Sequence, residues 1–182
     1  MVIVRFGGRK RMIRRIVGID PGPKTSGLVV YELSGPWPGR VLRSYKAATL
    51  DQVRMEIDEA ARMGSNFNWC EVVVECTQAG PPSTAVVKTT EVVGRIMERC
   101  DLRKIDCEPY YRREVLQALD CAKKGNKDGY VRAACIELHG GEKSVAVGTK
   151  KAPGPLYGVS SHGWQALGVV CTHLFSTPGG TR

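Results

Sequence analysis

The stretch from Arg14 to Leu33, RRIVGIDPGPKTSGLVVYEL, contains two short apolar runs separated by polar and small residues. The first run, residues 16–19, ends abruptly in Asp20-Pro21-Gly22, and the second run begins at Gly27. Apolar runs on either side of such a Pro- and Gly-containing segment are typical of a β-hairpin. The first strand therefore places a carboxylate at its own end, next to a loop.

Length and composition indicate one globular domain. A chain of 182 residues can bury one full core and is short for two. The sequence holds no apolar run long enough to cross a bilayer, and its basic N-terminus lacks the apolar stretch of a secretory signal. The seven cysteines are odd in number and form no C-x-x-C pair, which argues against a disulfide framework or a zinc site. We expect a cytoplasmic protein whose cysteines are reduced and serve as small apolar residues.

The charge distribution favours a polyanionic partner. The formal net charge is +9, which suits nucleic acid before other partners, although a basic protein without such a partner is the plain alternative. Every charged side chain before Asp20 is basic, and such an arm suits contacts with phosphates. These residues are Arg5, Arg9, Lys10, Arg11, Arg14 and Arg15.

Periodicity and turn signals give an alternating order of elements after an initial run of strands. We expect strands at 14–19, 27–33, 40–46, 70–76 and 104–107, helices at 51–63, 84–99, 111–119, 127–138 and 161–175, and a long loop at 142–160. This order predicts an α/β fold with a five-stranded mixed sheet, in which an antiparallel three-strand meander is joined by two parallel strands and helices cover both faces. The expected organisation is a basic arm at 1–13, a single domain at 14–176 and a flexible tail at 177–182.

Three polar residues stand at the ends of these elements. Asp20 ends the first strand, Glu75 ends a Val-rich strand, and His162 opens the final helix. If the two strands are parallel neighbours, both carboxylates emerge at one edge, where a cation would relieve their repulsion. Oxygen ligands with one imidazole suit Mg²⁺ or Mn²⁺, and two such ions about 4 Å apart can promote phosphodiester cleavage. Taken singly, Asp20 also fits a turn residue and His162 a helix-start residue.

Four segments in order resemble the motifs of RuvC-type Holliday junction resolvases, members of the ribonuclease H-like superfamily. They are GIDPGPKTSG at 18–27, VVVE at 72–75, KDGYVRAACIELHG at 127–140 and SHGWQALGVVCTHL at 161–174. The resemblance runs from about residue 14 to 175. It implies a ribonuclease H-like fold and a metal-dependent endonuclease for branched DNA that acts as a homodimer with two Mg²⁺ or Mn²⁺ ions in each active site.

Carried over by position, the resemblance assigns four catalytic residues. Asp20 and Glu75 match the first two carboxylates, and His162 falls where the family has an Asp or, in some members, a His. Gln165, one helical turn later, falls where the family normally has its last Asp, and a neutral amide offers a metal neither charge nor basicity. The expected metal ligands are therefore Asp20, Glu75 and His162. Asp128 is either a substitute acid or an early-helix charge that faces the helix dipole.

Basic residues on turns and helix starts form the expected DNA-binding set, although each alone fits an ordinary solvated surface. They are Lys24, Arg112, Arg113, Lys123, Lys124 and Lys127. Two other functions stay open. One is a catalytically weakened or inactive junction-binding protein, which Gln165 favours. The other is a YqgF-type nuclease of RNA processing, although the acidic-Arg-Ser/Thr motif usual in that type is not found.

Overall fold

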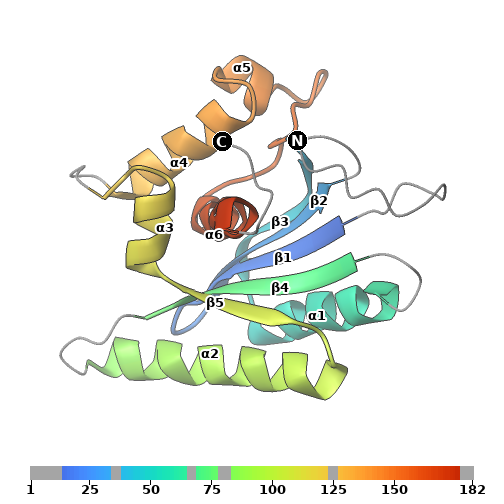
Figure 1. Cartoon of the computed structure of the whole chain (residues 1–182), viewed down its shortest axis with the longest axis vertical. Coiled ribbons are helices and arrows are strands. Elements are labelled where there is room, and N and C mark those ends of the chain that lie inside the picture. The colour runs from blue at the N-terminus through green and yellow to red at the C-terminus, as the bar shows by residue number, and fades with distance from the viewer. Residues whose placement is uncertain (1–13, 34–37, 65–68, 78–82, 123–126, 177–182) are drawn as a thin grey trace.

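Five strands form one mixed sheet in the order β3-β2-β1-β4-β5 (Figure 1). The computed structural model describes residues 14–33, 38–64, 69–77, 83–122 and 127–176. The antiparallel pairs are β1–β2 and β2–β3, and the parallel pairs are β1–β4 and β4–β5, which confirms the predicted sheet. The strands are β1 Arg14–Asp20, β2 Ser26–Leu33, β3 Arg40–Ala48, β4 Trp69–Cys76 and β5 Cys107–Tyr111. The predicted arm at 1–13 and tail at 177–182 lie outside the described residues.

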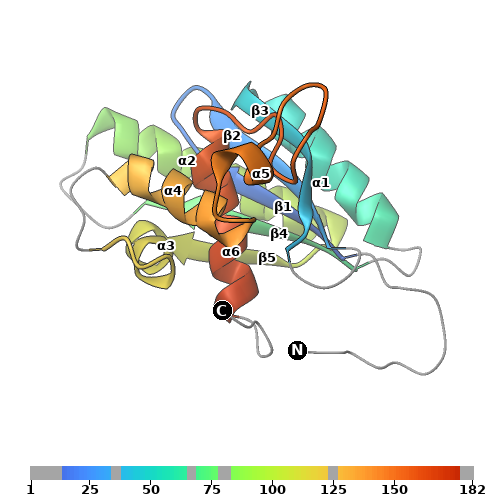
Figure 2. The same ribbon diagram turned by 90° about the horizontal axis from the view of Figure 1, so that it is seen from above.

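Helices cover both faces of the sheet, as predicted. Figure 1 shows α1 and α2 beneath the sheet and α6 above it, with α3 and α4 beyond α6, and Figure 2 shows the same layers from above. The helices are α1 Leu50–Gly64, α2 Thr84–Arg103, α3 Arg112–Ala118, α4 Lys127–Leu138, α5 Lys143–Ala146 and α6 Gly163–Ser176. Within the described ranges no helix is both long and apolar enough to cross a membrane.

The core consists of two apolar layers, one on each face of the sheet. Successive side chains of a strand point to opposite faces, so Ile16 packs with α6 and its neighbours while Val17 and Ile19 pack with α1 and α2. Helix α6 is buried on nearly all sides, because the sheet lies on one side of it and α3 and α4 on the other. Gly18 permits this close approach, since a Cβ atom there would lie 2.6 Å from the carbonyl oxygen of Ala166.

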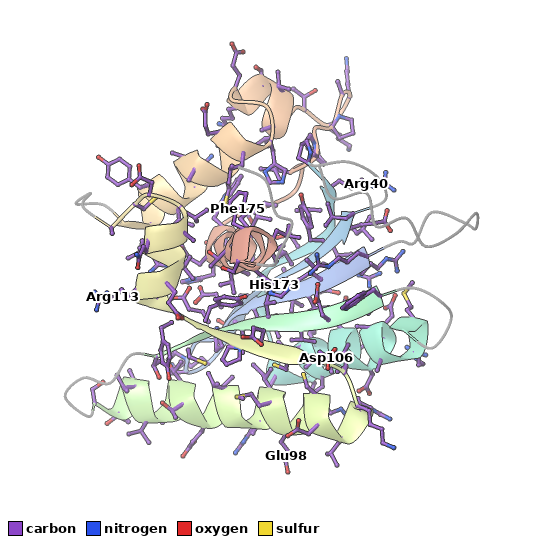
Figure 3. The ribbon with its side chains drawn as sticks, viewed as in Figure 1. Arg40, Glu98, Asp106, Arg113, His173 and Phe175 are labelled. Atoms are coloured by element: carbon purple, nitrogen blue, oxygen red, sulfur yellow. The ribbon has the colours of Figure 1, made fainter. Side chains whose placement is uncertain are left out.

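A polar cluster joins α6 to the starting ends of β1 and β4. Arg14 donates from Nε to Oε1 of Glu71 at 2.6 Å, and Nε2 of His173 lies 3.1 Å from the other oxygen of this carboxylate. Nδ1 of His173 lies 2.9 Å from the hydroxyl of Tyr110. Figure 3 shows His173 between α6 and the sheet. Burial opposes ionisation of Glu71, but hydrogen bonds from His173 and Arg14 prevail and lower its pKa. The cluster therefore fixes the C-terminal half of α6.

Two predictions about the second half of the chain were wrong. The strand expected at 104–107 lies at Cys107–Tyr111, because α2 continues to Arg103 and ends at Lys104, whose φ of 55° is left-handed and whose N–H bonds to the carbonyl of Asp101. The segment 142–160, expected as a loop, contains α5 and a β-bridge between Gly148 and Pro153. Its apolar residues pack into the core, which orders the segment.

Candidate active site

The carboxyl ends of three neighbouring parallel strands deliver charged groups to one edge of the sheet. Asp20 is the last residue of β1, Glu75 is the penultimate residue of β4, and Arg112 directly follows β5. Parallel neighbours end at the same edge, so the chain needs no special loop to bring these three residues together. The predicted convergence of the two carboxylates follows from this pairing.

His162 is placed by a close contact across the hairpin. Gly27 is the cross-strand partner of Asp20, and a Cβ atom at Gly27 would overlap the carbonyl oxygen of His162. Only glycine leaves room for the chain to cross β2 at this point. Ser161, with a left-handed φ of 48°, turns the chain into α6 just before this crossing. As a result Nδ1 of His162 lies 3.6 Å from Oδ2 of Asp20.

Arg112 joins four elements of the site. Its Nη1 donates to Oε1 of Gln165 in α6 at 2.6 Å and lies 3.4 Å from Oε2 of Glu75 in β4. Its Nη2 donates to Oδ1 of Asp128 in the first turn of α4. The start of α3, which carries Arg112, is fixed by the side chain of Glu114, which accepts a hydrogen bond from the N–H of Tyr111 at 2.6 Å.

All four residues predicted to be catalytic line one open pocket of about 490 Å³ at this edge. The pocket lining consists of Asp20, Pro21, Gly22, Pro23, Lys24, Thr25, Glu75, Arg112, Asp128, His162 and Gln165. Of the predicted DNA-binding residues, Lys24 and Arg112 therefore lie in the pocket. Arg113 is exposed and points away from the domain (Figure 3). Lys127 is the first residue of α4, and Lys123 and Lys124 lie outside the described residues.

The position of Arg112 inside the carboxylate site was not predicted from the sequence. Arg112 was predicted to bind DNA as a basic residue at a helix start. Its contacts with the carboxylates were not expected, because the preceding strand was predicted to end at Cys107. A correct prediction of β5 at Cys107–Tyr111 would have shown a basic residue directly after the third parallel strand, and this position indicates a residue of the site. The same rule that located Asp20 and Glu75 would then have located Arg112.

Burial raises the pKa values of both strand-end carboxyls. The pKa of Asp20 rises to about 6, mainly through burial, while Arg112 lowers it and Asp128 raises it. The pKa of Glu75 rises to about 7 through burial and through the negative charge of Asp20, again opposed by Arg112. One guanidinium does not balance this concentration of negative charge, so the site favours a further cation.

The donor set suits one hard divalent cation by its chemistry. Asp20 and Glu75 offer carboxylate oxygens and His162 offers an imidazole nitrogen. Across the described ranges, no three His, Cys, Asp or Glu side chains form a group placed to hold a metal ion. Gln165 does not complete such a set, because its carbonyl oxygen accepts the hydrogen bond from Arg112. The chemistry of Asp20, Glu75 and His162 therefore suits one cation, although in the described geometry these three side chains are not grouped around a common ion position. The site offers poor ligands for a second cation.

Comparison with solved structures shows which known fold the chain shares. Among the structures that resemble the chain, the Thermus thermophilus RuvC structure aligns at a TM-score of 0.63 and 21% identity, over 93% of this chain and 98% of that one. T. thermophilus RuvC in complex with Holliday junction substrate aligns at a TM-score of 0.62 and 21% identity, over 90% of this chain and 93% of that one. The chain has the RuvC fold. This likeness confirms the predicted ribonuclease H-like class and the resemblance to RuvC at the level of fold. No protein-family model and no curated protein sequence matches the chain.

Proposed function

We propose that the chain is a metal-dependent endonuclease that cleaves phosphodiester bonds in branched DNA and resolves four-way junctions by paired nicks. One observation carries the proposal: Asp20, Glu75 and His162 line a single pocket at the carboxyl edge of the parallel strands, on a RuvC fold. The net charge of +9 suits a polyanionic substrate. The structure of T. thermophilus RuvC with a Holliday junction substrate supports the choice of junction DNA.

Asp20, Glu75 and His162 would hold Mg²⁺ or Mn²⁺, which when bound supplies a Lewis acid and a water molecule of lowered pKa. In the hydrolysis, the oxygen of one water molecule bonds to phosphorus and one phosphorus–oxygen bond to a deoxyribose breaks. One proton of the water ends on the released sugar hydroxyl, and the other leaves the phosphomonoester for solvent. Lys24 at the pocket and Arg112 within it attract and orient the phosphate.

Two nicks in one junction call for two active sites, so we propose that the chain works as a homodimer. Each protomer would supply its own Asp20, Glu75 and His162, since one chain contributes all three to one pocket. Light scattering during size-exclusion chromatography, with and without a four-way junction, tests this. A protein that stays monomeric on the junction and still cuts both strands would contradict the dimer.

A second candidate is a junction-binding protein without nuclease activity. It is favoured by Gln165, whose amide brings no charge to the site and is already bonded to Arg112. The two candidates share the substrate and differ only in cleavage. A single assay with matched variants therefore separates them.

The assay incubates the protein with a labelled four-way junction or a linear duplex of the same sequence, in Mg²⁺, Mn²⁺ or a chelator. The nuclease predicts symmetric nicks near the branch point that need a metal ion and disappear in Asp20→Asn. Asp106→Asn is the control, because Asp106 is exposed at the opposite edge of the sheet, just before β5 (Figure 3). Tight junction binding without cleavage in every metal would leave the binding protein. Equal binding of junction and duplex would refute both.

A further inference from the structure

The guanidinium of Arg112 is held in place by several side chains of the site. Its guanidinium contacts oxygens of three side chains that come from β4, α6 and α4. Two of these side chains are largely buried: that of Glu75 is 11% exposed, and Gln165 as a whole residue is 7% exposed. An arginine on a solvated surface would not be held by three elements at once. The fold therefore positions this cation within the carboxylate site.

The partner of Arg112 on α6 is neutral. Gln165 accepts a hydrogen bond from Arg112 at 2.6 Å, but its amide carries no charge to attract a metal ion. A metal ion at Gln165 would compete with Arg112 for the same carbonyl oxygen and would lie beside a positive guanidinium. Both effects disfavour a metal ion at this end of the pocket.

The remaining partner of Arg112 faces solvent. The side chain of Asp128 is 75% exposed, whereas that of Arg112 is 24% exposed, so this carboxylate approaches the guanidinium from the open side of the pocket. An anion that enters from solvent meets Arg112 at the same side. Guanidinium binds phosphate oxygens with the planar, two-pronged geometry that it uses for carboxylate. A phosphate can therefore replace Asp128 while Gln165 keeps Arg112 in position.

From these contacts we infer that Arg112 takes the place of a second metal ion and binds the phosphate that is to be cleaved. The site then holds one divalent ion, on Asp20, Glu75 and His162, and one permanent cation supplied by the chain. This inference rests on the proposed nuclease function and specifies its substrate-binding group. Under this inference Gln165 is compatible with the proposed nuclease activity, because its amide oxygen holds Arg112 where a carboxylate would hold a metal ion.

Counting bound Mn²⁺ in the absence of DNA tests the inference directly. Electron paramagnetic resonance and isothermal titration should give one Mn²⁺ per chain for the wild type and also for Gln165→Asp, in which Arg112 pairs with the new carboxylate. The double change Arg112→Ala with Gln165→Asp should give two, because a carboxylate then faces an empty position. Two ions in the wild type, or two in Gln165→Asp with Arg112 still present, would overturn the inference.

The phosphate-binding role is tested on the junction itself. Arg112→Ala should keep one Mn²⁺ per chain and lose about 100-fold or more in single-turnover cleavage, the typical effect of removing one positioned donor. Arg95→Ala is the control, because Arg95 is exposed on α2, on the other face of the sheet. Unchanged cleavage by Arg112→Ala would refute the role. If the wild type binds one Mn²⁺ per chain but never cleaves the junction, the proposed nuclease function is refuted, whereas the inferred single metal ion is supported.

Discussion

Replacing Glu75 by glutamine should make the metal-free protein more stable, because the site holds an ionised group that folding desolvates. Burial and Asp20 raise the pKa of Glu75 from 4.5 to about 7. At 1.36 kcal/mol per pKa unit, ionised Glu75 costs the folded state about 3 kcal/mol at alkaline pH. Glutamine keeps the shape, removes the charge and gives up only the long 3.4 Å contact with Arg112. We expect a net gain of about 2 kcal/mol, or about 4–8 °C in the melting temperature.

The sign of this effect depends on pH. A raised pKa means that Glu75 favours folding below its unfolded value of 4.5 and loses that contribution as the pH rises through about 7. The advantage of Glu75→Gln should therefore be complete at about pH 8 and vanish near pH 4. Urea unfolding with a chelator at both pH values measures it, with Glu98→Gln, on the outer face of α2, as the control (Figure 3). A variant that is less stable at pH 8, or equally stabilised at pH 4, would refute this reasoning.

Three further predictions concern α6 and the metal ion. Gly18→Ala should cost more than about 2 kcal/mol, because its Cβ would lie 2.6 Å from the carbonyl oxygen of Ala166; a wild-type midpoint in urea would contradict this. His173→Ala should cost about 2–3 kcal/mol by leaving buried Glu71 short of a partner, yet it should preserve the Mn²⁺ count, and thermal melts with metal titration check both. Mn²⁺ at 100 times its dissociation constant should stabilise the wild type by about 2.7 kcal/mol, whereas Asp20→Asn should show no such gain in thermal melts.

The sequence was informative wherever a local pattern determines the outcome. The alternation of apolar and small residues around Asp20 and the Val run before Glu75 are strand signals, and parallel pairing then brings the two carboxylates to one edge. His162 was located by its place at the start of the final predicted helix and Gln165 by the resemblance, and both line the pocket.

The features of the site that could not be predicted from the sequence depend on contacts between distant segments. The approach of His162 to Asp20 requires glycine at position 27. This requirement cannot be recognised until the contact between His162 and β2 is known. The contacts of Arg112 with the carboxylates were not predicted because β5 lies a few residues later than expected, and a short strand after a helix has no strong period of its own. A local pattern gives the strand ends, and only the assembled sheet gives the partners of Arg112.

The position of α6 in the chain determines when the site can exist. This helix follows all five strands in the sequence, yet it covers β1, β2 and β4 and carries Gln165 into the pocket. During synthesis, the apolar face of these strands stays uncovered until α6 has left the ribosome, which makes the unfinished chain prone to aggregation. The same order has a protective side. A nascent chain that ends before α6 carries Asp20 and Glu75 without His162 and Gln165, so the proposed nuclease could not cut DNA until α6 has been synthesised.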